Sequence, residues 1–188
     1  MKIKNKQRIL IVIIIIELIA LICLGALYVS THDVFIPSFA QWNKCDNDYI
    51  LNGETVNFKV KSRKLTIRDD EENVLYRTEK GVYVSDAFCI DIDRDGEQEI
   101  CLLTWKRGSY GEHKPFWVSE DTDRWTQHIF LYEWDSARND RLDPKWMSSE
   151  IGIKVVKIFG DEECKLHLID TEGNETICSW EGWGLTIE

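Results

Sequence analysis

The stretch CIDIDRDGEQEI, residues 89–100, concentrates acidic side chains between two apolar segments. Asp91, Asp93, Asp95 and Glu99 stand at alternate or near-alternate positions, and Gly96 lies among them. Glycine adopts positive φ without a Cβ penalty, so it favours a sharp chain reversal at this point. The flanking residues, rich in Ile, Leu and Cys, are typical of buried β-strands. The stretch therefore predicts a tight acidic turn that joins two strands.

The strand pattern extends over the chain beyond residue 45. Short segments alternate apolar with polar residues, and turn residues such as NGE, DDEEN and EGNE separate them. No segment there keeps a 3.6-residue apolar period over three turns, which disfavours helices. The expected strands are YIL, TVNFKV, KLTIRD, VLYRT, VYVSDAFCIDI, EICLLTW, HIFLYEW, PKWMSS, IKVVKIF, KLHLID and ETICSW.

An internal similarity between residues 73–105 and 143–180 fits repeated antiparallel units. A closed propeller needs at least four blades of about 40–45 residues each. Residues 45–188 scarcely supply that length. We therefore expect an all-β fold in which an N-terminal transmembrane helix precedes an antiparallel β ectodomain. Its two or three blade-like sheets would be arranged like part of a propeller or packed as a sandwich.

Counted from Asp91, the carboxylates of the acidic turn occupy positions 1, 3, 5 and 9. Calcium takes six to eight oxygen ligands in a flexible shell, and alternate residues of a tight turn can converge on one ion. Carboxylates packed without a cation would repel one another. We expect one calcium ion, bound through the side chains of Asp91, Asp93, Asp95 and Glu99 and through the carbonyl of Glu97. The alternative is a solvated acidic hairpin that binds no metal tightly.

Other metal-binding patterns fit the stretch less well. An EF-hand needs a bidentate Glu at position 12 and helices on both sides, whereas position 12 is Leu102 and both flanks resemble strands. The turn has no His or Cys at zinc-ligand spacing. Magnesium usually keeps several waters and rarely uses an all-protein cage.

The segment DIDRDGEQEI resembles the calcium loop of FG-GAP/VCBS-type repeats, the β-propeller repeats of integrin α-chains and of many bacterial surface proteins. Their pattern is D-x-D-x-D-G-x-x-D followed by an apolar strand. The resemblance covers about residues 84–105 and implies the same five calcium ligands. This chain departs from the pattern with Glu99 at position 9 and Arg94 at position 4, where glycine is common, and it lacks the Phe-Gly and Gly-Ala-Pro elements. The later DTEGNE is not a full loop, so one ion is expected.

The first 28 residues differ from the rest of the chain. Four basic residues precede a 20-residue apolar run whose one charge is Glu17. About 20 apolar residues span a ~30 Å hydrocarbon core, and basic residues before such a run favour a cytoplasmic N-terminus. We expect a cytoplasmic basic segment at 1–8, a transmembrane helix at 9–28, a juxtamembrane linker at 29–44 and an extracytoplasmic β domain at 45–188.

A cleaved signal peptide is the alternative for this run. Its apolar core is usually about 7–15 residues, whereas this run is longer and the nearest plausible cleavage site, SFA at 38–40, lies well beyond it. Glu17 is costly near the centre of a membrane span. It either contacts a membrane-helix partner or is outweighed by the surrounding isoleucines.

Charge and cysteine content limit the partners. After residue 28 the chain carries 19 basic and 32 acidic residues, a net charge of −13. This argues against nucleic acid as a partner and against tight contact with anionic lipid, because both need a basic surface. Outside the cell this part of the chain could form disulfides, but its odd number of cysteines leaves at least one unpaired. A Cys89–Cys101 bridge would staple the acidic turn; otherwise both are small buried hydrophobes. The connectivity is open among Cys45, Cys89, Cys101, Cys164 and Cys178.

Residues 105–125 form the longest segment without a clear strand pattern, and we call them the aromatic loop. Long loops on rigid scaffolds often carry binding residues, and aromatic with cationic groups suit a protein or carbohydrate partner. The alternative is that the loop folds over its own sheet and buries its rings. The candidate contacts are Trp105, Arg107, Tyr110, His113 and Trp117.

These features favour a membrane-anchored, extracytoplasmic binding or interaction module with one structural calcium site over an enzyme. The sequence has no nucleophile elbow, no H-E-x-x-H and no glycine-rich phosphate loop. One alternative is a hydrolase acting on cell-surface glycan, which needs two carboxylates about 5–9.5 Å apart in a cleft. Another is an accessory subunit of a membrane complex, bound through Glu17 and the unpaired cysteine.

Overall fold

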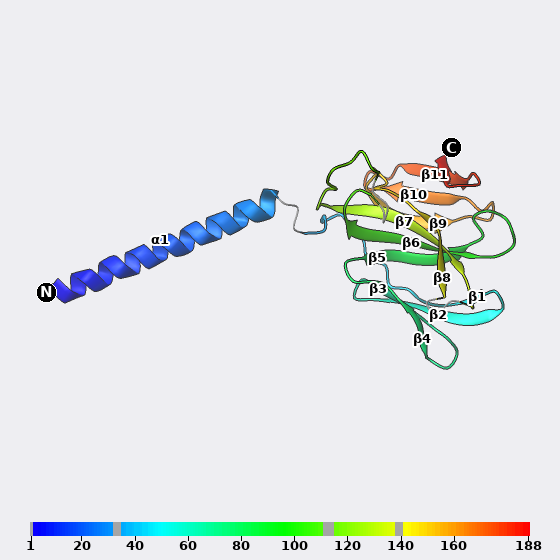
Figure 1. Ribbon diagram of the computed structural model, residues 1–188, viewed down its shortest axis with the longest axis horizontal. Helices are drawn as coiled ribbons and strands as arrows, with labels where there is room; N and C mark the ends of the chain where they lie inside the picture. The colour runs from blue at the N-terminus through cyan, green and yellow to red at the C-terminus, as the bar shows by residue number, and fades with distance from the viewer. Residues whose placement is uncertain (1, 32–34, 111–114, 138–140) are drawn as a thin grey trace. The chain divides into compact units, whose positions relative to one another are not determined.

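The computed structural model describes residues 2–31, 35–110, 115–137 and 141–188. The chain divides into two compact units, Met1–Phe35 and Ile36–Glu188. The first contains one helix, and the second, which we call the β domain, contains the strands (Figure 1).

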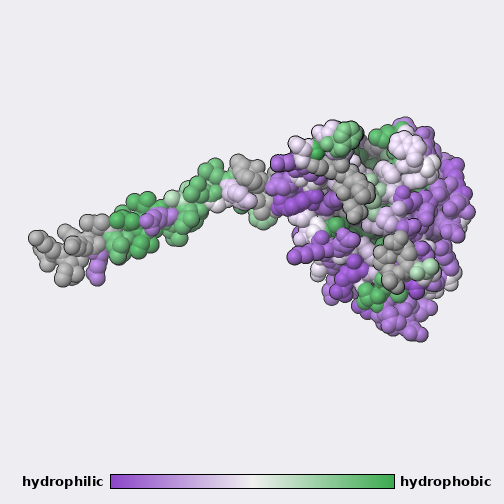
Figure 2. Space-filling model, viewed as in Figure 1, coloured by the Kyte–Doolittle hydropathy of each residue, from purple (hydrophilic) through white to green (hydrophobic). Residues whose placement is uncertain are grey.

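Helix α1 spans Lys2–Thr31, and its part from Leu10 to Val29 is long and apolar enough to cross a membrane. Its described side chains are exposed, including Glu17, and its surface is largely hydrophobic (Figure 2). A signal sequence meets the same criteria of length and composition. The helix confirms the expected apolar element, and its orientation in a membrane stays a prediction.

Within the described residues, the β domain contains three four-stranded sheets, each an antiparallel meander in chain order (Figure 1). The first sheet holds β1 (Asp46–Leu51), β2 (Glu54–Lys61), β3 (Lys64–Arg68) and β4 (Val74–Arg77). The second holds β5 (Tyr83–Ile90), β6 (Glu99–Arg107), β7 (Trp125–Trp134) and β8 (Leu142–Met147). The third holds β9 (Val155–Gly160), β10 (Leu166–Asp170), β11 (Glu175–Trp180) and β12 (Leu185–Ile187). None of these described sheets closes on itself.

The second sheet contributes to two separate hydrophobic cores. One core joins it to the first sheet and the other joins it to the third. Successive residues of β6 alternate between them: Ile100 and Leu102 belong to the first core, and Cys101 and Leu103 to the second. This double burial explains why EICLLTW reads as a continuous apolar run, because a strand covered on both faces has no solvent-facing positions.

The register of β5 and β6 separates Cys89 from Cys101. Cys101 lies opposite Phe88, and Cys89 lies opposite Ile100. Cys89 packs against the first core and Cys101 lies in the second. All six cysteines lie in described segments and are free. The disulfide staple of the acidic turn is therefore absent; Cys101 is buried, as the alternative expects, and Cys89 is half-buried.

The eleven expected strand segments all correspond to strands. The sequence interpretation missed β12, a three-residue edge strand that pairs with β11. The internal similarity has a structural basis, because each of its two segments begins on the last strand of one sheet and continues into the opening strands of the next.

Residues 36–44, expected as part of a linker, belong to the compact β domain. The backbone N–H of Asn43 donates to the carbonyl of Ser85 at 2.9 Å. The ring of Phe39 packs 5.4 Å from that of Trp105. Helix α1 extends to Thr31.

Candidate metal centre

The acidic turn, residues 91–99, joins β5 to β6 through a network of side-chain to backbone bonds. The carboxylate of Asp91 accepts the N–H groups of Asp95 and Gly96, each at 3.1 Å. Gly96 has φ 93° and Arg94 has φ 63°, so the chain reverses through the left-handed region that glycine tolerates best. The carboxylate of Asp95 accepts the N–H of Glu97 at 2.8 Å.

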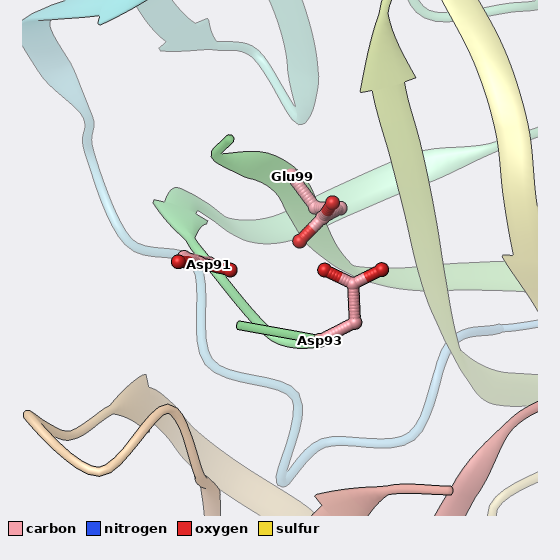
Figure 3. Close-up of side chains that lie close together, drawn as sticks. All are labelled: Asp91, Asp93 and Glu99. Carbon is pink, nitrogen blue, oxygen red and sulfur yellow. The ribbon is translucent and has the colours of Figure 1, made fainter. Parts of the chain in front are cut away.

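Three carboxylates of the turn converge. Asp91, Asp93 and Glu99 each place an oxygen within 4.8 Å of the others, and Glu99 is buried while the two aspartates are half-buried. Asp93 and Glu99 point toward one another (Figure 3). Bound calcium has oxygen ligands at about 2.3–2.6 Å, so oxygens spaced in this way can contact one ion.

Lys145 of β8 supplies a positive charge to the same cluster. Its ammonium lies 2.5 Å from Asp93 Oδ2 and 2.7 Å from Glu99 Oε1, with Glu133 Oε1 at 3.2 Å. The Lys145 side chain is 9% exposed and that of Glu99 is 2% exposed, which makes this a largely desolvated ion pair. The N–H of Ile92 donates to the other oxygen of Glu99 at 2.9 Å.

The pKa values of the pair reflect burial and mutual attraction. Burial alone would lower the pKa of Lys145, but its hydrogen bonds to Asp93 and Glu99 outweigh burial and raise that pKa. Burial raises the pKa of Glu99, although the bonds from Lys145 and from the Ile92 N–H oppose the rise. The lysine is therefore charged at neutral pH. Removing it would make Glu99 harder to ionise than it is in the unaltered chain, because burial would then be less opposed.

The cluster retains features that suit a divalent cation. Asp93 Oδ1 is buried and has no hydrogen-bond partner, although a buried polar atom normally has one. The three carboxylates and Lys145 carry a formal charge of −2. A hard divalent cation with oxygen preference matches both the charge and the donor type. The residues present could therefore hold a divalent cation that shares the carboxylates with Lys145 or displaces it.

Two of the five expected ligands lie outside the convergent cluster. The side chain of Asp95 is bonded within the turn, and Glu97 is an exposed residue of the same turn. Arg94 instead fixes the turn to the third sheet, because its guanidinium donates to the carbonyl of Glu163 at 2.5 Å. The acidic turn is thus bonded to β8 through Lys145 and to the turn between β9 and β10 through Arg94.

The aromatic loop separates into a buried base and an exposed part. Trp105 is a core residue of β6, so the expectation that it contacts a partner was wrong: the continuous burial of β6 removes its ring from the surface. Arg107 stacks over Trp125, 5.0 Å from the ring centroid, and donates to the carbonyl of Asp123 at 2.5 Å. His113 lies outside the described residues.

Asp121 shapes the base of the aromatic loop. Its carboxylate accepts the N–H groups of Ser109 at 2.8 Å and Tyr110 at 3.2 Å, and these bonds lower the pKa of Asp121 against the opposing effect of burial. Beyond this base, Phe116 is 94% exposed and Trp117 is 73% exposed. Their rings meet edge to face at 4.9 Å, so the loop does not bury these two rings.

Sequence reasoning missed Lys145 and Glu133 as members of the cluster. Lys145 lies in PKWMSS, a segment expected only as a strand, and no local pattern links it to residues 91–99. The strand order β6-β7-β8 and the register of Tyr132 with Pro144 bring it there. Only knowledge of the pairing across β7 could have identified this lysine.

Comparisons of the chain with protein-family models, with curated proteins and with solved structures give no match. The resemblance of residues 84–105 to calcium-binding repeats therefore stays a prediction from the sequence.

Proposed function

We propose that this chain is a membrane-anchored, extracytoplasmic binding module whose β domain is braced by one calcium ion. The observations that carry the proposal are the convergence of Asp91, Asp93 and Glu99 and the buried Asp93 Oδ1, which has no hydrogen-bond partner. The apolar part of helix α1, Leu10–Val29, follows four basic residues and supports the anchor. Three consecutive four-stranded meanders support the blade-like interpretation of the sheets.

Calcium would be structural. Its ligands would be the side chains of Asp91, Asp93 and Glu99, with Asp95 and Glu97 completing the shell after rearrangement of the turn. Lys145 already uses one oxygen of Asp93 and one of Glu99, so ammonium and calcium compete for these groups. Such competition favours weak binding, in the range of about 10⁻⁴–10⁻³ M that extracellular calcium modules use. A site of that affinity fills outside the cell and stays empty in the cytoplasm.

Thermal unfolding of the full chain with calcium or with chelator tests this proposal. An ion that binds only the folded state at about 100 times its Kd adds about 2.7 kcal/mol, which corresponds to roughly 5–10 °C in Tm for a domain of this size. We expect Glu99→Gln to abolish the calcium-dependent shift. Glu97→Gln is the matched control, because it removes a charge from the same turn and keeps the expected carbonyl ligand. An identical Tm in calcium and in chelator would overturn the calcium site.

The exposed pair Phe116 and Trp117 supports a binding role for the aromatic loop. Large rings exposed side by side are uncommon on a solvated surface and mark contact sites. The bonds from Ser109 and Tyr110 to Asp121 fix the loop where it leaves β6. A rigid base with exposed aromatic rings suits a protein or a carbohydrate at the cell surface.

Binding of the full chain to arrayed cell-surface glycans and to surface-protein fractions tests this part. We expect Phe116→Ser/Trp117→Ser to abolish the binding that the unaltered chain shows. Trp183→Ser is the control, because Trp183 is 85% exposed and belongs to the turn between β11 and β12. Binding that survives the double change, or that fails equally in the control, would refute a specific role for the loop.

A further inference from the structure

A groove on the β domain gathers positive charge in an acidic protein. It has a volume of about 550 Å³ and is lined by residues 42–46, by the hairpin of β2 and β3, and by Val84 of β5. Four of the lining residues are basic and one, Asp46, is acidic. The cations are Lys44, Lys59, Lys61 and Arg63. We call this the basic groove.

Backbone hydrogen bonds hold the walls of the basic groove together. The N–H of Val60 donates to the carbonyl of Cys45 at 2.8 Å, and the N–H of Val84 donates to the carbonyl of Arg63 at 2.9 Å. The N–H of Asn43 donates to Ser85 of β5 at 2.9 Å. The three walls are therefore fixed relative to one another, and the groove does not depend on side-chain conformation alone.

The turn that carries Arg63 has positive φ at two residues that are not glycine. Ser62 and Arg63 have φ values of 53° and 65°, and a two-residue hairpin turn of this kind normally takes Asn-Gly. The Arg63 guanidinium lies 4.4 Å from the centre of the Trp42 ring. The turn therefore places a guanidinium beside an aromatic ring of the groove.

We propose that the basic groove binds a phosphate group. Lys59 is partly neutralised by Asp46, with 2.6 Å between Nζ and Oδ2, whereas Lys44, Lys61 and Arg63 have no acidic partner lining the groove. Three cations exceed what a singly charged carboxylate requires and suit a doubly charged phosphate. Guanidinium binds phosphate through paired N–H donors and ammonium binds it as a point charge. Trp42 supplies an apolar surface for the organic part of the ligand.

The phosphate could belong to a soluble phosphate ester or to the headgroup of a membrane phospholipid. Both present the same oxyanion to the same cations, and the experiment separates them. The site is distinct from the acidic turn, which lies between β5 and β6, so it does not depend on calcium binding and is tested in the presence of chelator.

Lysine acetylation of the full chain, read by mass spectrometry, gives a residue-level assay. The chain is placed in nanodiscs of neutral phosphatidylcholine, in the same nanodiscs with added inorganic tripolyphosphate, and in nanodiscs that contain phosphatidylglycerol. We expect Lys44 and Lys61 to be protected in the tripolyphosphate arm for a soluble source, or in the phosphatidylglycerol arm for a lipid source. Lys80 and Lys154, exposed and outside the groove, are internal controls and should be labelled equally in all arms.

Arg63→Gly tests whether the guanidinium contributes. Glycine suits the positive φ at this position, so the variant should fold, and we expect it to bind about tenfold more weakly, the effect of losing one charge-assisted contact. Lys154→Ala removes a charge elsewhere and should bind normally. Equal labelling of Lys44 and Lys61 in all three arms would overturn the proposal. Protection of the control lysines to the same extent would also overturn it, because it would indicate non-specific charge screening.

Discussion

Replacing Lys145 by methionine separates the two cations that the acidic turn could use. The variant removes the ammonium and keeps a flexible apolar side chain that can fill the same space. In the structure, this ammonium contacts Asp93, Glu99 and Glu133. Without it, the buried Glu99 and the half-buried Asp93 face one another with no positive group from the protein between them.

The magnitude follows from the burial of the partners. Removing one member of a buried ion pair costs about 3–5 kcal/mol, because it leaves an uncompensated buried charge. Glu133 adds little, because its side chain is 53% exposed and exposed pairs contribute about 0–1 kcal/mol. Protonation of Glu99, whose pKa burial already raises, relieves part of the repulsion. We therefore expect Lys145→Met to lose about 3 kcal/mol in chelator, near the lower end of that range, or roughly 6–12 °C in Tm.

Calcium should reverse much of this loss. A divalent ion compensates the same carboxylates, and the variant no longer has an ammonium that competes for them. We expect the Tm difference between Lys145→Met and the unaltered chain to shrink in calcium, and the apparent calcium affinity of the variant to rise.

Near-UV circular dichroism of the buried tryptophans follows unfolding of the β domain in the full chain, with and without calcium. Lys154→Met is the control, because Lys154 is exposed. A variant as stable as the unaltered chain in chelator would show that Lys145 does not compensate the cluster. A loss of the same size in calcium and in chelator would refute calcium binding at these carboxylates.

Two further predictions concern the fold and its pH dependence. Leu102→Ala and Leu103→Ala should each lower the free energy of unfolding by about 2–5 kcal/mol in urea titrations, because Leu102 lies in the first core and Leu103 in the second. A variant as stable as the unaltered chain would refute burial of the corresponding face of β6. The pKa of His167 is raised by hydrogen bonds to Asp161 and then to Glu175, so its stabilisation is complete below the unfolded-state pKa of about 6.5 and is lost as the pH rises through the raised folded-state pKa. His167→Gln should accordingly reduce the urea midpoint near pH 6 and leave it nearly unchanged near pH 9, whereas an equal reduction at both values would contradict this assignment.

The strands could be predicted because their signal is local. Alternation, β-branched residues and turn chemistry mark each segment without reference to the others. The short strand β12 was not predicted, because its three residues, two of them exposed, show almost no alternation of apolar and polar side chains. The apolar helix could likewise be predicted from length and hydropathy alone. The local sequence pattern therefore predicts the described helix and every described strand except β12.

The arrangement of the elements required information that the sequence does not display locally. Trp105 looked like the start of a binding loop, because the run after it is rich in rings and charges, yet it ends a strand that is covered on both faces. Lys145 lies in a segment expected only as a strand, and no local pattern links it to the acidic turn. Both cases have one cause. The second sheet lies between two others, and sequence alternation cannot reveal a third layer.

The other acidic turns of the β domain explain why a run of carboxylates is not by itself a metal site. Asp69 accepts two N–H groups of its turn through Oδ1 and the side-chain amide of Asn73 through Oδ2. Asp170 is satisfied in the same way by its own turn. Asp91 also accepts two N–H groups of its turn, one on each oxygen, so the conformation of its side chain alone needs no ion. The difference lies in Glu99, whose side chain is 2% exposed, and in Asp93, whose Oδ1 is buried without a hydrogen-bond partner. Buried carboxylates require a compensating cation that solvated ones do not.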